Sequence, residues 1–260
     1  MLGVAIGTYV TAIGAGGGFL LTPLLLLRHP GADPEFVTAA SLSVVGISAG
    51  LSSVVSFRHR RIDLPVVAIL LATTVPGALL GARFTEIVPR TAFHLGFAVL
   101  LLLLAVYLAW RPTGAIVDPL ARGWRRQLQD REGNIFVYRV RLLGSTWASF
   151  IGAFVAALSG IGGGVLFVPL ATRVMRLPHA VAIPAAYVTT TALSLTVVSF
   201  HLAAGHIGEP LRDAPWLALG MLASNPLAQR LHGRLGEGPL TRLLAGGLLL
   251  VAVRTAWGAL

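Results

Sequence analysis

The sequence predicts an all-α polytopic membrane protein. About eight transmembrane helices are expected to form two homologous four-helix halves, with the first and fifth helices broken at Gly-rich segments. Of the 260 residues, 55% are hydrophobic and only 12% are charged, which is more apolar than an ordinary soluble domain. The apolar residues gather into long stretches, and two similar glycine-rich segments occupy corresponding places in the two halves.

The apolar stretches are long enough to cross a bilayer, because a transmembrane helix needs about 20 apolar residues. Spans are expected at residues 2–27, 36–57, 64–84, 91–110, 143–172, 180–203, 214–235 and 239–258. The first stretch lacks the positively charged start of a signal peptide, and we therefore expect it to be a span. All ten acidic residues fall in connections or at span edges, so we predict no carboxylate at the middle of the membrane.

Three regions follow from this assignment: an N-terminal four-span repeat at 1–111, a polar arginine-rich connector at 112–141, and a C-terminal four-span repeat at 142–260. The arginines and aromatic residues of the connector are typical of a solvated segment that rests on lipid headgroups. A substrate gate is the alternative interpretation. The short connections and the long connector place arginines on opposite sides, so the positive-inside rule leaves the orientation open.

Charge and cysteine content narrow the function classes. The net charge is +10, but the arginines are scattered between apolar stretches, whereas nucleic-acid binding requires a continuous basic face. Membrane lipids and a small anionic substrate are the expected partners, with no nucleic acid, and a homodimer is left open. The absence of cysteine excludes disulfides, thiolate metal sites and cysteine nucleophiles. No cofactor and no metal site are expected, because His94 and His201 have no second ligand at helical spacing.

The two halves share an internal repeat. GAGGGFLLTPL at 14–24 aligns with GIGGGVLFVPL at 160–170, with the glycines and the proline in register. VVSF also occurs twice, at 54–57 and at 197–200. We expect four true crossings in each half, which would give both halves the same orientation. A re-entrant hairpin at the glycines would instead make an inverted pair possible.

Each glycine segment is expected to break its helix, since a glycine in a helix interior costs about 1 kcal/mol against alanine. Such a break persists in a membrane only inside protein or beside a cavity. The half-helix beginning near Phe19 or Val165 would direct unpaired N–H groups and its positive dipole end at the break, which suits an oxyanion. The alternative is close helix packing through small residues. The predicted substrate-binding residues are Gly14, Gly16, Gly17, Gly18, Phe19 and Pro23 in the first segment, and Gly160, Gly162, Gly163, Gly164, Val165 and Pro169 in the second.

Hydroxyl side chains cluster in the second and sixth spans. We predict that Ser41 and Ser56, together with Thr190 and Ser199, line a polar path to the glycine breaks. Ordinary hydrogen bonding between helices is the alternative interpretation. Asn225 precedes a proline and could supply an amide to the same cavity, or bond a carbonyl that the proline leaves free.

The doubled GxGGG…P segments, in a chain of about eight spans, resemble those of the TauE/SafE sulfite-exporter family. The likeness covers essentially the whole chain. Members of that family are bacterial or archaeal inner-membrane permeases associated with the export of sulfite, sulfoacetate and related organosulfur anions. The resemblance therefore implies a multi-pass protein of a prokaryotic plasma membrane that exports such an anion.

The expected function is secondary transport of a small sulfur oxyanion or organosulfonate, bound between the two broken helices while the halves rock about it. The membrane potential would assist export of an anion by about 2.3 kcal/mol per charge per 100 mV. An anion channel and a non-transporting binding or sensory protein are the alternatives. An enzyme is not expected, because Ser159, the candidate nucleophile, has no histidine or acid at depth to act as its base.

Overall fold

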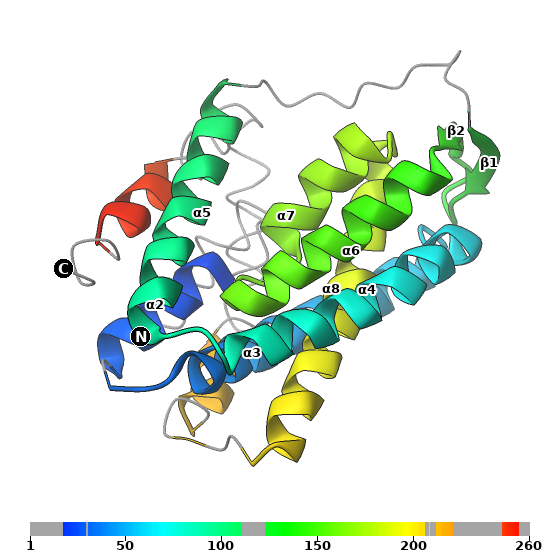
Figure 1. The fold of residues 1–260 in the computed structure, drawn as a ribbon. Coiled ribbons are helices and arrows are strands. Elements are labelled where there is room, and N and C mark those ends of the chain that lie inside the picture. The colour runs from blue at the N-terminus through cyan, green and yellow to red at the C-terminus, as the bar shows by residue number, and fades with distance from the viewer. Residues whose placement is uncertain are drawn as a thin grey trace.

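The computed structural model describes residues 18–29, 31–110, 123–205, 208, 212–220 and 246–254. Its elements in chain order (Figure 1) are α2 (Gly18–Arg28), α3 (Pro34–Arg58), α4 (Leu64–Thr85), α5 (Arg90–Trp110), β1 (Trp124–Gln129), β2 (Ile135–Val140), α6 (Leu142–Ser159), α7 (Gly164–Pro169), the π-helical turn η1 (Leu170–Val174) and α8 (His179–Ala203). Residues 212–220 and 246–254 are also helical. Among the described residues, five helices are long and apolar enough to cross a membrane: α3, α4, α5, α6 and α8.

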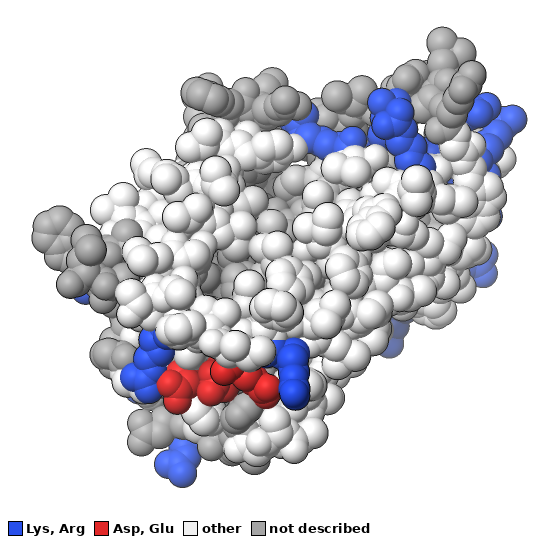
Figure 2. Space-filling model, in the orientation of Figure 1, with Lys and Arg blue, Asp and Glu red and all other residues white. Residues whose placement is uncertain are grey.

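The outer faces of these helices are apolar. Large exposed side chains include Ile47, Leu51 and Val54 on α3, Val75, Leu79 and Phe84 on α4, Val99 and Leu103 on α5, and Trp147 and Ile151 on α6. In Figure 2 the charged side chains gather at opposite edges of the view, and the broad surface between them carries none. Continuous apolar surface of this kind is unfavourable in water and suits contact with lipid.

Proline and glycine set several helix boundaries. Pro34 opens α3 and Pro65 lies in the first turn of α4, where the missing N–H of proline removes no helical hydrogen bond. Pro178 directly precedes α8. Gly160 ends α6 in the left-handed conformation, with φ of +68°, as glycine commonly does after the last helical residue.

Helices α4 and α6 pack side by side and run in the same direction. Gly77 of α4 lies against the backbone oxygen of Phe150, and Gly81 lies against that of Phe154. Because the residue numbers rise together along the contact, the two helices are parallel. The glycines let the two backbones approach closely, as small residues do in membrane helix pairs.

Helices α3 and α8 pack side by side but run in opposite directions. Gly46 of α3 meets Ser194 of α8, whereas Gly50, one turn further along α3, meets Thr191. Ser53 Oγ also lies 3.2 Å from Thr191 Oγ1. Since the residue numbers of α8 fall as those of α3 rise, this pair is antiparallel.

The structure corrects the prediction of a single fifth crossing at 143–172. The chain reverses after α6, and α7 with η1 returns along the helix that it has just left (Figure 1). Gly152 of α6 lies against Leu170, and Gly144, two turns earlier, lies against Val174. The predicted break is therefore present, but it is the turn of a helical hairpin rather than a kink in one continuous span.

The physical reason for the reversal lies in the backbone of the turn. Gly160 has φ of +68° and Gly162 has φ of +75°, a region that other L-residues rarely adopt. Two such residues so close together redirect the chain, and the apolar side chains of both arms then bury one another. A hydropathy pattern depends only on how apolar the residues are, and this is the same for one kinked span and for a helical hairpin.

The connector also departs from the expectation of an all-α chain, because it contains a β-hairpin. Strands β1 and β2 are antiparallel. Tyr138 and Val140 point to the helices and are buried, and they join a core cluster with Val66 and Leu70 of α4. The hairpin is thus packed on the start of α4 and does not merely link two membrane units.

Candidate functional site

The second glycine segment forms a tight turn that has no space for larger residues. A Cβ atom on Gly162 would lie 2.6 Å from Val45 Cγ1 of α3. A Cβ atom on Gly163 would overlap Thr190 Oγ1 of α8. Gly164 then opens α7. Both the backbone conformation and the neighbours therefore require glycine in this turn.

The two glycine segments meet in space. A Cβ atom on Gly18 would overlap the backbone carbonyl of Ile161, so the described end of the first segment touches the second. Phe19, Ile161 and Val165 are buried in one apolar cluster. Of the other predicted residues in the first segment, Gly14, Gly16 and Gly17 lie outside the described residues.

Helix α2, described from Gly18 onward, and helix α7 both run away from this meeting point. Helix α2 packs on α3 and is joined to it by a short connection, so the pair is antiparallel. The same holds for α7–η1 and α8. Because α3 and α8 are themselves antiparallel, α2 and α7 point in opposite directions, and the described start of α2 at Gly18 faces the N-terminus of α7 across the glycine turn. The first N–H groups of a helix have no intrahelical partner, and each N-terminus carries about half a positive charge.

Two buried hydroxyl groups hold the turn in place. Ser41 Oγ of α3 donates a hydrogen bond to the carbonyl oxygen of Gly160 at 2.8 Å, and Thr22 Oγ1 of α2 lies 3.0 Å from the same oxygen. Thr22 Oγ1 also lies 3.1 Å from Ser41 Oγ, and its single proton serves one of these two acceptors at a time. The carbonyl group of the residue that caps α6 is thereby satisfied, and the turn is fastened to both α2 and α3.

Thr190 supplies an unpaired donor at the turn. It is 2% exposed, and its Oγ1 has no hydrogen-bond partner among the described residues although it lies beside Gly163. Ser194, one turn further along α8, is equally buried, and its Oγ also lacks a partner within the part of the chain that the structure describes. Buried polar atoms without a partner are uncommon, and a bound ligand or water is the usual explanation.

The remaining predicted residues lie away from the turn. Ser56 donates to the carbonyl of Ser52 within α3, which is the ordinary helix-satisfying role, and Ser199 is exposed. Pro23 lies inside α2, and Pro169 stands where α7 passes into the π-helical turn. Asn225 lies outside the described residues.

The sequence prediction did not include Thr22. In the aligned second segment the corresponding position holds Val168, so a comparison of the two repeats does not select it. The available signal was a hydroxyl residue one turn after the last glycine, at the distance where a side chain can reach back to a helix break.

A second polar cluster lies where the β-hairpin meets α4. The Asp63 carboxylate is buried and accepts hydrogen bonds from Arg126 Nε at 3.0 Å, from Arg126 Nη2 at 2.8 Å, and from Tyr138 Oη at 2.6 Å. Burial and the bond to Asp63 raise the pKa of Tyr138, and the same carboxylate raises the pKa of Arg126. These groups satisfy one another, so the cluster fastens the hairpin to α4. In the described part of the chain, no three His, Asp or Glu side chains gather as a metal site would need.

Comparison with known proteins finds a matching family model and a similar protein. The family model "Sulfite exporter TauE/SafE" matches residues 1–255. The chain is also 26% identical over 214 residues to the "Probable membrane transporter protein YunE" of Bacillus subtilis (strain 168), and the match covers 80% of this chain and 78% of that protein. No solved structure matches the chain.

Proposed function

Because the chain belongs to the sulfite exporter TauE/SafE family, we propose that this multi-pass membrane transporter exports a small sulfur oxyanion or organosulfonate, such as sulfite or sulfoacetate, across the plasma membrane of a prokaryote. The family and the similarity to YunE carry the assignment to membrane transport. The convergence of the described start of α2 and the N-terminus of α7 at the glycine turn is the observation that supports an anionic substrate.

The substrate would lie between the two helix N-termini. Its oxygens would accept hydrogen bonds from the first N–H groups of α2 and α7, and the two dipoles would favour its negative charge. The glycines let the anion approach the backbone, and the Thr190 hydroxyl adds a side-chain donor. The sequences of α2, of the turn and of α7 contain no acidic residue that would repel an anion.

Alternating access would follow from an inverted pair of repeats. The segment α2–α3 corresponds by the repeat to α7–η1–α8, and the antiparallel packing of α3 on α8 supports an inverted rather than a parallel relation between the halves. In transporters of this plan, the substrate binds where the repeats meet, and the two repeats move against each other about it. The glycine turn, where Gly18 touches Ile161, would be such a meeting point.

The distribution of arginines supports a cytoplasmic location for the end of the molecule that carries the β-hairpin, called here the β-hairpin end. The chain reversal returns the end of η1 to that side, where Arg173 lies 5.7 Å above the ring of Tyr107 near the end of α5. Cytoplasmic connections are typically rich in arginine. Apart from Arg254 in the last described helix, the described arginines divide into those of the β-hairpin end, which are Arg58, Arg60, Arg61, Arg125, Arg126, Arg131, Arg139, Arg141, Arg173 and Arg176, and those of the far end, which are Arg28, Arg83, Arg90 and Arg212.

The experiment is anion flux from proteoliposomes loaded with sulfite or sulfoacetate, under a potassium-diffusion potential. A potential that is negative inside the loaded proteoliposomes should speed efflux of the anion. It adds about 2.3 kcal/mol to the driving force for each negative charge and each 100 mV. Gly163→Leu should abolish flux because it fills the turn beside Thr190. The matched control is Gly96→Leu on α5, where a Cβ atom meets nothing within 4 Å, and this variant should retain flux.

The outcomes of this assay test the substrate site and distinguish a transporter from an anion channel and from a membrane sensor. Undiminished flux in folded Gly163→Leu protein rejects the glycine turn as the substrate site. A single-molecule conductance far above carrier turnover indicates an anion channel. Substrate binding without flux in the parent protein indicates a membrane sensor.

A further inference from the structure

A cationic pocket lies between the tip of the β-hairpin and the loop that joins α3 to α4. Its volume is about 650 Å³, and its lining consists of Arg58, Arg60, Gln129, Asp130, Arg131 and Gly133. The two walls are joined by a backbone hydrogen bond, in which the Arg131 N–H donates to the carbonyl of His59 at 3.0 Å. The pocket is thus a feature of two connected loops rather than a chance gap between mobile side chains.

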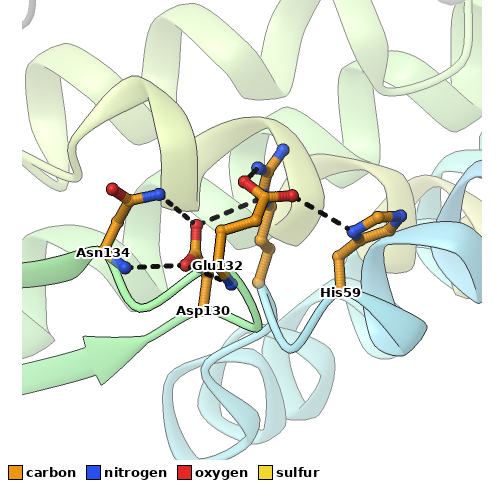
Figure 3. Close-up of polar contacts among 5 residues, drawn as sticks. His59, Asp130, Glu132 and Asn134 are labelled. Carbon is orange, nitrogen blue, oxygen red and sulfur yellow. Dashed lines mark hydrogen bonds and ion pairs between the residues drawn. The ribbon is translucent and has the colours of Figure 1, made fainter.

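The acidic groups near the pocket are already occupied (Figure 3). The Asp130 carboxylate accepts bonds from the backbone N–H of Glu132 and from both the backbone and the side chain of Asn134, at 2.9–3.0 Å. The side-chain bond from Asn134 is the main cause that lowers the pKa of Asp130. The Glu132 carboxylate lies 2.6 Å from Arg61 Nη2 and 3.5 Å from His59 Nδ1.

The arginines that line the pocket remain uncompensated. Arg58, Arg60 and Arg131 are exposed, and none of them forms an ion pair within the described part of the chain. Arg60 also has φ of +54°, where glycine or asparagine is less strained. A positively charged side chain held in an unfavourable backbone conformation, in a pocket whose acidic groups are already hydrogen-bonded or paired with Arg61, is suited to receive an anion.

The surroundings of the pocket favour a lipid as the source of that anion. The pocket lies at the ends of α3 and α4, and Phe57 and Leu64 next to it are 60% and 58% exposed. Its volume is in the range of sites for small organic molecules, and a bare oxyanion would leave most of it to water. We propose that this pocket binds the phosphodiester headgroup of an anionic phospholipid, whose acyl chains lie along the apolar side chains below. This site is separate from the substrate site and does not depend on the transported anion.

The test measures the thermal unfolding midpoint of the purified full chain in detergent as phosphatidylglycerol is added. Phosphatidylglycerol should raise the midpoint in a saturable way, and phosphatidylcholine should not. A basic side chain near an anionic lipid contributes about 1 kcal/mol, which is about fivefold in affinity. The triple variant Arg58→Gln, Arg60→Gln and Arg131→Gln should therefore bind phosphatidylglycerol about a hundredfold more weakly.

The matched control removes the same charge from the same end of the molecule. Arg125→Gln, Arg139→Gln and Arg141→Gln alter exposed arginines outside the pocket and should change the affinity little. The single variant Arg60→Gly shows whether a loss of binding comes from misfolding or from the lost charge. Glycine relieves the backbone strain at this position, so the variant removes the charge without disturbing the fold. This single variant should be as stable as the parent and bind about fivefold more weakly.

Three results would overturn the proposal. Unchanged lipid affinity in the pocket triple variant would mean that the lipid binds elsewhere. An equal loss in the control triple variant would mean that overall charge, and not the pocket, attracts the lipid. If inorganic phosphate gave the same stabilisation and displaced phosphatidylglycerol, the pocket would belong to a soluble oxyanion instead.

Discussion

The bonds from Ser41 and Thr22 to the carbonyl of Gly160 predict a specific pattern of non-additive stability. Both side chains are fully buried, and their hydroxyl oxygens lie 2.8 Å and 3.0 Å from the same carbonyl oxygen. Ser41→Ala or Thr22→Val removes one donor, but each leaves the other in place. Each single variant should lose about 0.5–1.5 kcal/mol of the free energy of unfolding, the ordinary net value of a hydrogen bond.

The double variant removes both donors and leaves the buried Gly160 oxygen without either. A buried acceptor without a partner costs about 1–3 kcal/mol, in addition to the two lost bonds. The double variant should therefore be less stable than the sum of the singles by about 1–3 kcal/mol. Because the carbonyl belongs to the turn between the two helix N-termini, anion flux should also fall further in the double variant than in either single variant.

The assay is unfolding of the purified chain by sodium dodecyl sulfate in mixed micelles, followed by the loss of helical circular dichroism. Four proteins complete the cycle: the parent chain, Ser41→Ala, Thr22→Val and the double variant. A double variant whose loss equals the sum of the singles would contradict the shared-acceptor geometry. A single variant that loses as much as the double would show that one hydroxyl carries the whole contact.

Three further predictions concern other contacts. Thr190→Val should weaken binding of sulfite or sulfoacetate by about tenfold to a hundredfold in equilibrium titration and leave stability unchanged, because the hydroxyl has no partner to lose among the described residues; an unaltered affinity would remove Thr190 from the site. Tyr138→Phe should destabilise the chain by about 1.5–3 kcal/mol in the same unfolding assay, through the lost bond to Asp63. The raised pKa of Tyr138 means that the folded state keeps this proton above pH 10 while the unfolded state loses it, so stability should fall with pH above 10 in the parent and less steeply in Tyr138→Phe; parallel pH profiles would contradict this. Gly81→Ala places a methyl group 2.5 Å from the Phe154 carbonyl oxygen and should cost about 1–3 kcal/mol, whereas an alanine at the open Gly96 position should not; equal losses would refute tight packing between α4 and α6.

Parts of the candidate site could be predicted from the sequence because they depend on local chemistry. The GxGGG segments predict a helix break wherever they lie, and the break after Ser159 is present. The choice among the hydroxyl residues could not be made in the same way. Ser56 satisfies its own helix, whereas Ser41 and Thr190 reach the turn, and this difference depends on which face of each helix meets the glycines.

The β-hairpin shows a similar limit. Its strands alternate between exposed and more buried residues, a period-2 pattern that could have been read from the sequence, but arginine-rich connectors in membrane proteins are commonly irregular. The hairpin is stabilised by Asp63, which comes from a distant loop and accepts bonds from Arg126 and Tyr138. A partner 63 or 75 residues away leaves no mark on the local pattern.

The sequence by itself determined that this chain is a multi-pass membrane protein, that α3, α4, α5 and α8 are apolar spans, and that the chain breaks at the second glycine segment, because hydropathy and backbone preference are properties of neighbouring residues. The tertiary structure alone decided that the chain reverses at Gly160–Gly163, that α3 and α8 run antiparallel, and that Gly18 of α2 meets the turn from which α7 begins. The direction in which a chain leaves a glycine turn is set by the packing of the two arms, and that packing involves residues far apart in the sequence.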